Sequence, residues 1–301
     1  MIICRLKGGL GNQLFQYAIA RRLSKKCNCD FKLDISAFQN DNFGRDYMLG
    51  KFNVIQNIVT SEELRTINLW FSNSCKGKLL RCGSKVLPYY RRYIVNETRP
   101  YFYDQNILKI RNNSCLNGYW QNENYFKEIR DILLKEFVVV SKLRGKNKDL
   151  ADDINKTNSV GIHIRRHKGI QSNSVLYKKV VSQYGLVSNE YYNRAVDIIA
   201  NKQSNIEVFV FSDDIEWAKA NLNFTYPITF VDNNDEANGY EDFRLLSLCK
   251  HQIIANSTFS WWAAWLNNYH DKVIISPNKW VQSLLNIPNG IYPDNWLLLN
   301  N

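Results

Sequence analysis

The stretch IICRLKGGLGNQLFQYA, residues 2–18, decides the fold of the first half of the chain. Its first five residues are typical of a buried strand, and Phe15, Ile19 and Leu23 then recur at the i, i+4, i+8 spacing of a helix face. The glycines therefore form a strand-to-helix turn, where backbone approaches a ligand and helix N–H groups face it. A phosphate is the usual occupant, and a connection without a ligand is the alternative. The spacing is neither G-x-G-x-x-G nor the P-loop pattern, so neither a dinucleotide site nor an ATPase is indicated.

Short apolar runs alternate with helical patterns from about residue 158 onward. Alternating strands and helices predict a parallel sheet covered on both faces. The polar stretch 141–158 is interpreted as a linker. We therefore expect an α/β protein with two domains, residues 1–150 and 151–301, that face a cleft and bind ligands beyond the carboxyl ends of their strands. The predicted strands are residues 160–165, 208–212, 228–231, 253–255 and 273–276, and the predicted helices are residues 190–202, 215–221, 240–249 and 261–268.

The composition is that of a globular protein, with 45% hydrophobic residues among 301 and too few glycines and prolines for a disordered chain. The sequence has neither a signal peptide at Met1 nor an apolar run long enough to span a bilayer, which favours a cytoplasmic protein. The seven cysteines are an odd number without C-x-x-C spacing. That pattern fits reduced thiols better than disulfides or a metal site.

The net charge of +11 lies entirely in the first half of the chain. Residues 1–150 carry 26 Lys and Arg against 13 Asp and Glu, or +13, whereas residues 151–301 carry 13 against 15, or −2. Between Lys76 and Arg99, seven basic residues and one acid, Glu97, are mixed with apolar and tyrosine side chains. This mixture suits peripheral contact with an anionic membrane. A solvated basic face and a nucleic-acid surface are the alternatives, but no nucleic-acid-binding module accompanies the charge, so no nucleic acid is expected as a partner.

The stretch VGIHIRRHK, residues 160–168, carries the candidate residues with the most specific chemistry. Alternation along a strand places His163 and Arg165 on the same face, and Arg166 follows where the strand ends. Two guanidinium groups at a strand end suit a diphosphate, because each planar fork donates paired hydrogen bonds and keeps its charge. The alternative is a pair of surface arginines beside a buried, hydrogen-bonded histidine.

Acidic residues follow two further strands. Ser212 and Asp213 precede a predicted helix, and capping of that helix explains them adequately. Asp232 follows the next strand, where its carboxylate is placed to accept the paired N–H donors of guanine or a ribose hydroxyl. An ordinary turn aspartate is the alternative. The chain contains no D-x-D sequence, so a metal–diphosphate clamp is not indicated.

A second anion site is predicted at a helix start near the end of the chain. Ser257 and Thr258 supply hydroxyl groups there, together with the free N–H groups of the helix. The tryptophans that follow are interpreted as packing residues. Together with the strand ends described above, these residues predict a nucleotide diphosphate site without a metal. The tryptophans are Trp261, Trp262 and Trp265.

Five stretches in this order resemble the bacterial α-1,2-fucosyltransferases of glycosyltransferase family 11: GGLGNQLFQYA, GYWQNENYF, HIRR, FSDDIEWAK and ANSTFSWWAAWL. The resemblance implies a GT-B fold of two Rossmann-like α/β domains. The first would carry the GGLGNQ loop, the basic face and the acceptor side, and the second would bind GDP-fucose. The resemblance also implies an inverting, metal-independent transfer of L-fucose from GDP-fucose to the 2-hydroxyl of a terminal β-galactose, with no cofactor.

The resemblance further implies roles for individual residues. Arg165 would hold the diphosphate and help GDP to leave, with His163 and Arg166 beside it, and Asp232 would bind guanine. Positive groups and helix N-termini would stabilise the departing GDP, a role that Mg²⁺ has in other enzymes. The loop facing the diphosphate and the fucose would consist of Gly9, Gly11, Asn12 and Gln13, the last two catalytic, and the phosphate site would include Ser257, Thr258 and Ser260.

The sequence departs from the family pattern at one point. The family motif H-x-R-R-G-D continues here as His167-Lys168, so the acid at that position is absent and the catalytic base is left open. An inactive relative that only binds a GDP-sugar and an enzyme that forms another fucosyl linkage are the alternatives. The basic first half favours a location at the inner face of a bacterial membrane, where a lipid-linked glycan would present the acceptor.

Overall fold

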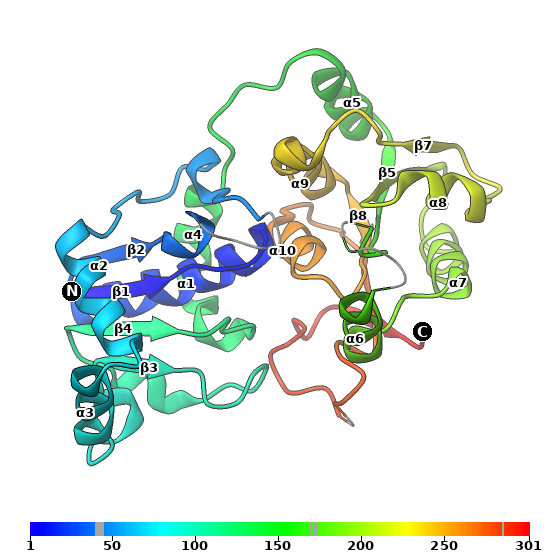
Figure 1. Cartoon of the computed structure of the whole chain (residues 1–301). Helices are drawn as coiled ribbons and strands as arrows, with labels where there is room; N and C mark the ends of the chain where they lie inside the picture. Colours follow the sequence, from blue (N-terminus) through cyan, green and yellow to red (C-terminus); the bar gives the residue numbers. More distant parts are fainter. Residues whose placement is uncertain (40–44, 169, 171–173, 285) are drawn as a thin grey trace. The chain divides into compact units, whose positions relative to one another are not determined.

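The computed structural model describes residues 1–39, 45–168, 170, 174–284 and 286–301 (Figure 1). The chain forms two compact units, Met1–Val138 with Pro288–Tyr292, and Val139–Ile287 with Pro293–Asn301. The division thus falls between Val138 and Val139, where residue 150 was expected.

The predicted linker at residues 141–158 is wrong. Helix α5 (Gly145–Lys156) occupies most of it and buries Leu150, Ala151 and Ile154 in the second unit. These three apolar residues form one face of a short amphipathic helix, which the many charged residues around them conceal in the composition.

The first unit is built on a parallel four-stranded sheet in the order β2-β1-β4-β3. Helix α1 (Leu10–Cys27) follows β1 and buries Phe15, Ile19 and Leu23, as the spacing predicts. Helix α2 begins at a capping box in which Thr60 and Glu63 exchange side-chain and backbone hydrogen bonds. The strands are β1 (Ile2–Arg5), β2 (Phe31–Asp34), β3 (Ile94–Asn96) and β4 (Ser114–Asn117), and the other helices are α2 (Ser61–Phe71), α3 (Cys75–Ser84) and α4 (Arg130–Glu136).

The second unit has a parallel six-stranded sheet in the order β10-β9-β8-β5-β6-β7. The alternation of strands and helices predicted from the sequence is confirmed, while β10 and α6 are elements that the pattern did not indicate. The strands are β5 (Asn158–Ile164), β6 (Ile206–Ser212), β7 (Ile228–Phe230), β8 (His251–Ile253), β9 (Ile274–Pro277) and β10 (Leu297–Leu299). The helices after α5 are α6 (Val175–Tyr184), α7 (Asn189–Ala200), α8 (Ile215–Asn221), α9 (Gly239–Leu248) and α10 (Thr258–Leu266).

The core of the second unit forms on both faces of β5 and β6, whose residues are buried almost without interruption. Helix α7 packs Tyr191, Tyr192 and Val196 into this core. The tryptophans of α10 are buried and pack against one another, as expected for packing residues. The sheet is therefore a rigid base for the loops that follow its strands.

Each sheet changes its winding direction at one pair of neighbouring strands. The chain runs from β5 outward through β6 and β7, then returns to the other side of β5 with β8 (Figure 1). In the first unit β2 lies on one side of β1, and β4 lies on the other. Ligands of open parallel sheets bind outside the carboxyl ends of the strands at such switch points. Ligand-binding residues are therefore expected in the loops after β1 and β4 and in those after β5 and β8.

Two further observations concern the chain as a whole. All seven cysteines are free thiols. No helix among the described residues combines the length and the apolar character that crossing a membrane requires.

Candidate functional site

Arg165 and Asp213 form an ion pair at the carboxyl edge of the second sheet. Ile164 at the end of β5 lies opposite Ser212 at the end of β6, so the next residue of each strand meets its counterpart. The Arg165 guanidinium lies 3.1 Å from an Asp213 carboxylate oxygen. Asp213 also accepts hydrogen bonds from the backbone N–H of Arg166 at 2.7 Å and of Lys168 at 3.1 Å. Asp213 therefore holds both the Arg165 guanidinium and the backbone of the loop at residues 165–168 in place.

The prediction that Asp213 caps the following helix is wrong. The N-cap of α8 is Asp214, which makes no side-chain capping bond, and Asp213 is directed to the loop after β5 instead. Burial alone would raise the pKa of the Asp213 carboxyl, but Arg165 and the N–H of Arg166 hold that pKa below its usual value. Asp213 is thus an anion that positions the predicted diphosphate-binding arginine.

His163 is buried and packs against α10, the helix whose start is the second predicted anion site. Its side chain is only 5% exposed, and its ring stacks on Phe259 of α10 at 5.1 Å between ring centres. Burial lowers the pKa of His163 well below its usual value, so the imidazole is neutral at pH 7. Within the described residues its buried Nδ1 has no hydrogen-bond partner. A buried polar atom without a partner is costly in the free protein, and a ligand at this position would satisfy it.

The three residues after Arg165 are all held in place. The Arg166 guanidinium lies 4.0 Å above the ring of Trp217, and the Lys168 ammonium pairs with Asp214 at 3.0 Å. His167 has a φ of 61°, a conformation that glycine adopts without strain. The loop thus keeps the backbone shape that the glycine of the resembled motif favours. A lysine paired with Asp214 stands where that motif has its acid.

The start of α10 combines an open helix end with hydroxyl groups. Ser257 is the N-cap and makes no side-chain capping bond, so the first N–H groups of α10 lack a side-chain acceptor. Ser257 and Thr258 are half-buried. Ser260 is fully buried, and its hydroxyl donates to the Ser257 carbonyl at 3.3 Å. Ser257 and Thr258 are therefore available to an anion, whereas Ser260 is bonded back into its own helix.

The glycine-rich turn of the first unit has the geometry expected of an anion loop. Gly8 has a φ of 79°, which favours glycine, and Gly9 is the N-cap of α1 without a side-chain capping bond. A methyl group added at Gly9 would meet only open space. Asn12 is half-buried and accepts a hydrogen bond at 2.8 Å from the Gln121 amide, which follows β4. The loops after β1 and β4 thus meet at the switch point of this sheet.

Gln13 has a different place from the other loop residues. It is fully buried, and its amide nitrogen donates to the carbonyls of Gly8 at 2.9 Å and Asp46 at 2.8 Å. Its amide oxygen accepts from the N–H of Met48 at 2.9 Å. Both N–H donors are used within the unit, so Gln13 supports the shape of the loop.

Sequence reasoning missed a carboxylate beside this loop, Glu97. It follows β3 and accepts hydrogen bonds from the N–H groups of Tyr119 at 2.8 Å and Trp120 at 3.1 Å. Burial raises the pKa of the Glu97 carboxyl above its usual value. The Lys7 ammonium lies 4.7 Å from the centre of the Tyr119 ring, and burial lowers the Lys7 pKa. The signal available in the sequence was the isolation of Glu97 among basic residues.

Asp232 lies just past β7 and is ion-paired on both sides. One oxygen pairs with Lys146 at 2.9 Å and the other with Lys219 at 3.1 Å. Hydrogen bonds from these two lysines lower the pKa of Asp232. The pairs are exposed, and exposed ion pairs are worth about 0–1 kcal/mol. A nucleobase that offers two N–H donors would replace both lysine contacts at little cost.

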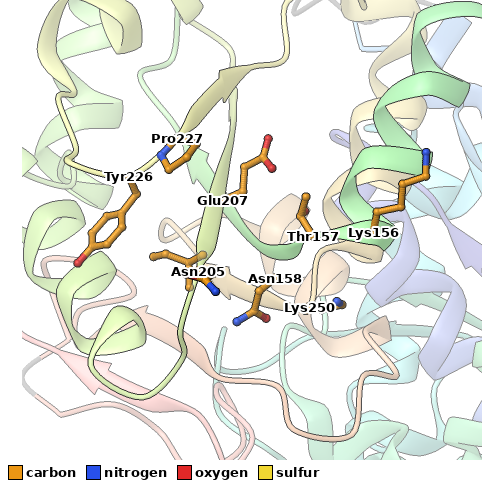
Figure 2. A pocket seen from close by; sticks show the side chains of 9 residues that line it. Lys156, Thr157, Asn158, Asn205, Glu207, Tyr226, Pro227 and Lys250 are labelled. Carbon is orange, nitrogen blue, oxygen red and sulfur yellow. The ribbon is translucent and has the colours of Figure 1, made fainter.

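A hollow of about 670 Å³ lies at the opposite edge of the second sheet, at the amino ends of β5 and β6 (Figure 2). It is therefore separate from the loops that carry Arg165 and Asp213. Its lining includes the polar side chains of Lys156, Asn158, Asn205, Glu207 and Lys250. Within the described residues, no group of three or more His, Cys, Asp or Glu side chains is arranged to hold a metal ion.

Two parallel α/β units of this kind define the GT-B fold of glycosyltransferases. A solved structure with this fold, a mutant of Arabidopsis thaliana FUT1 in complex with GDP, has a TM-score of 0.52 at 11% sequence identity, covering 91% of this chain and 69% of that chain. The chain belongs to glycosyl transferase family 11, whose sequence model matches residues 92–300.

Two relatives agree with this assignment. An α-1,2-colitosyltransferase from Escherichia coli is 32% identical, over 94% of this chain and 93% of its own length. Human galactoside α-(1,2)-fucosyltransferase 1 is 27% identical, over 50% of this chain and 42% of its own length. The family indicated by the motifs is confirmed, and the protein is a glycosyltransferase that transfers a sugar from a nucleotide-sugar donor.

Proposed function

We propose that the enzyme transfers L-fucose from GDP-fucose to the 2-hydroxyl of a terminal β-galactose, with inversion at the anomeric carbon. The observation that carries the proposal is the Arg165–Asp213 ion pair, which joins the ends of β5 and β6. Strand β8 pairs with the other side of β5, and the chain continues from β8 to the uncapped start of α10. A guanidinium and a helix N-terminus at one switch point suit a diphosphate. The α-(1,2)-fucosyl and α-1,2-colitosyl specificities in the names of the relatives support the linkage.

Arg165 and the N-terminus of α10 supply positive charge where the leaving group develops negative charge. The galactose oxygen attacks the anomeric carbon, the bond from that carbon to the β-phosphate oxygen breaks, and GDP leaves with the electron pair. His163 lies two residues before Arg165, and we propose that it stays neutral behind this site, with its unpaired Nδ1 buried. We propose that these groups make a divalent metal unnecessary, since preorganised donors at a leaving group supply the stabilisation that a metal supplies elsewhere.

The proton of the acceptor hydroxyl requires a base, and we propose Glu97 for this role. Its carboxylate lies at the carboxyl edge of the first sheet, and burial has raised its pKa, which makes it a stronger proton acceptor than an exposed glutamate. Asn12 and the Gly8–Gly9 turn lie at the switch point of the first sheet and are proposed to contact the fucose and the diphosphate. The acceptor is proposed to be a lipid-linked glycan at the cytoplasmic face of a bacterial membrane.

The test is a transfer assay with GDP-fucose and lactose in the presence of EDTA, with GDP release and product linkage as readouts. We expect a 2-linked fucosyl product without added metal. GDP-colitose serves as a second donor, because a colitosyltransferase is among the near full-length relatives. A product from GDP-colitose alone would overturn the choice of L-fucose. The enzymatic assignment would be overturned if the protein bound GDP but formed no product when each donor was tested with a panel of galactosides.

Asp232→Ala tests the proposed contact with guanine. Loss of one charged contact is expected to cost about 1–3 kcal/mol of donor binding, observed as a higher KM for GDP-fucose with little change in kcat. Asp152→Ala is the matched control, because Asp152 also forms an exposed ion pair, with Lys148 at 3.0 Å. An Asp232→Ala enzyme with the wild-type KM would exclude the guanine contact.

A further inference from the structure

The first unit has a cationic surface on α3 and the segment after it, residues 75–92, which we call the α3 surface. Residues 64–96 contain seven basic side chains and no Asp or Glu. In the described part of the chain none of these seven forms an ion pair, whereas Arg5, Arg21 and Lys32 of the same unit each pair with an acid. The charge of the surface is therefore not neutralised by the protein. Six of the seven lie on the α3 surface, namely Lys76, Lys78, Arg81, Lys85, Arg91 and Arg92, and Arg65 lies on α2.

An apolar stripe runs along the exposed side of α3. Leu79 is 74% exposed and Val86, in the turn after the helix, is 86% exposed; Cys75 and Cys82 are exposed as well. At 3.6 residues per turn Cys75, Leu79 and Cys82 fall within about 60° of arc, and Gly77 lies on the other side. Gly77 is buried in the region where α3 packs on α2. The stripe thus faces solvent because the helix is held by its opposite side.

A small hollow lies on the side of α3 that packs against α2, away from this stripe. Its volume is about 160 Å³, and it is lined by three basic residues over an apolar floor. Arg81 donates to the carbonyls of Trp70 and Ser72, and Arg92 donates to the Leu87 carbonyl at 3.0 Å, so both guanidinium groups are fixed by the backbone. Fixed cations without a carboxylate partner suit a phosphate group. The basic residues are Arg81, Lys85 and Arg92, and the floor includes Trp70, Phe71 and Ile94.

We propose that the α3 surface docks on an anionic lipid bilayer. Leu79 and Val86 enter the headgroup region, and the flanking lysines contact lipid phosphates. A helix with an apolar stripe flanked by lysines is the arrangement that lies in a membrane interface. A second copy of the chain would bring two clusters of unneutralised positive charge together, and a nucleic acid would leave the apolar stripe in water.

Vesicle flotation of the full chain tests the proposal without donor or acceptor, so its outcome is independent of the proposed transfer reaction. Vesicles of phosphatidylcholine with and without phosphatidylglycerol are compared at low and high salt. We expect binding only to the anionic vesicles, weakened by salt. The triple variant Lys76→Gln, Lys78→Gln, Lys85→Gln is expected to bind about 100-fold more weakly, at about fivefold for each lysine near the surface.

The control triple Lys142→Gln, Lys202→Gln, Lys279→Gln makes the same change in net charge at exposed positions of the second unit and is expected to keep wild-type binding. Leu79→Ser with Val86→Ser, which leaves the charge intact, is expected to lose about tenfold. All variants are expected to keep the wild-type Tm, since none of the changed side chains is buried. Equal flotation with neutral and anionic vesicles, or equal losses in both triples, would overturn the proposal. Retention of duplex DNA at salt that releases the vesicles would also overturn it and assign the surface to nucleic acid.

Discussion

Arg165→Ala is expected to lower kcat for sugar transfer by about 10²- to 10³-fold, the usual consequence of removing one preorganised charge from a leaving-group site. The effect on the donor KM is expected to be smaller, because the N-terminus of α10 and the guanine contact remain. Arg165→Lys should recover only part of the rate, since an ammonium keeps the charge but loses the paired hydrogen bonds of the guanidinium. Steady-state kinetics with GDP-fucose and lactose measure both effects.

Stability separates this role from a structural one. In Arg165→Ala, the Asp213 carboxylate loses its cation but keeps the two backbone N–H groups of the loop, so a modest fall in Tm is expected. Arg194→Ala, at an exposed arginine of α7, is the matched control and should leave kcat and Tm unchanged. Wild-type kcat in Arg165→Ala would contradict the proposed contact with the diphosphate.

Periodicity predicted strands β5 to β9 and helices α7 to α10 of the second unit. Each of these strands is a run of apolar residues, and each of these helices has buried apolar residues, so both signals are local. Helix α8 begins and ends at the predicted residues, Ile215 and Asn221. Helix α5 was missed because only three of its residues are buried, and a polar composition dominates a segment of that length. Local patterns thus predicted elements with large buried faces better than small elements at the edge of a unit.

The candidate site was only partly predictable, because its contacts join residues that are distant in the sequence. A motif indicates that Arg165 matters, but its pairing with Asp213 depends on the register of β5 against β6. Capping was a reasonable local interpretation of Asp213, and the strand register overrides it. The same limit applies to Gln13, because two of its three hydrogen bonds are made with the distant segment at residues 46–48. Sequence therefore identifies candidate residue types, and the fold decides which of them can face a ligand.

Glu97→Gln is expected to lower kcat by about 10²- to 10⁴-fold, the range associated with loss of a general base. In the wild-type enzyme the base is active when deprotonated, so kcat should fall as pH decreases through the Glu97 pKa. Burial raises that pKa, and the acidic limb of the profile should therefore lie above the usual pKa of glutamate. The glutamine side chain does not titrate, so the remaining activity of this variant should be independent of pH over the same range. A pH–rate profile of both enzymes measures this.

The competing role for Glu97 is structural, since its carboxylate also holds the N–H groups of Tyr119 and Trp120. A methyl group on Gly118 would come within 2.4 Å of the Glu97 Cβ, so loop and side chain are closely packed. Glutamine has the same shape but only one acceptor oxygen, and a modest fall in Tm is expected. Glu62→Gln, at the exposed start of α2, is the matched control and should change neither rate nor Tm. A Glu97→Gln enzyme with a lower Tm but the wild-type acidic limb would make Glu97 a loop anchor and return the search for the base to other residues.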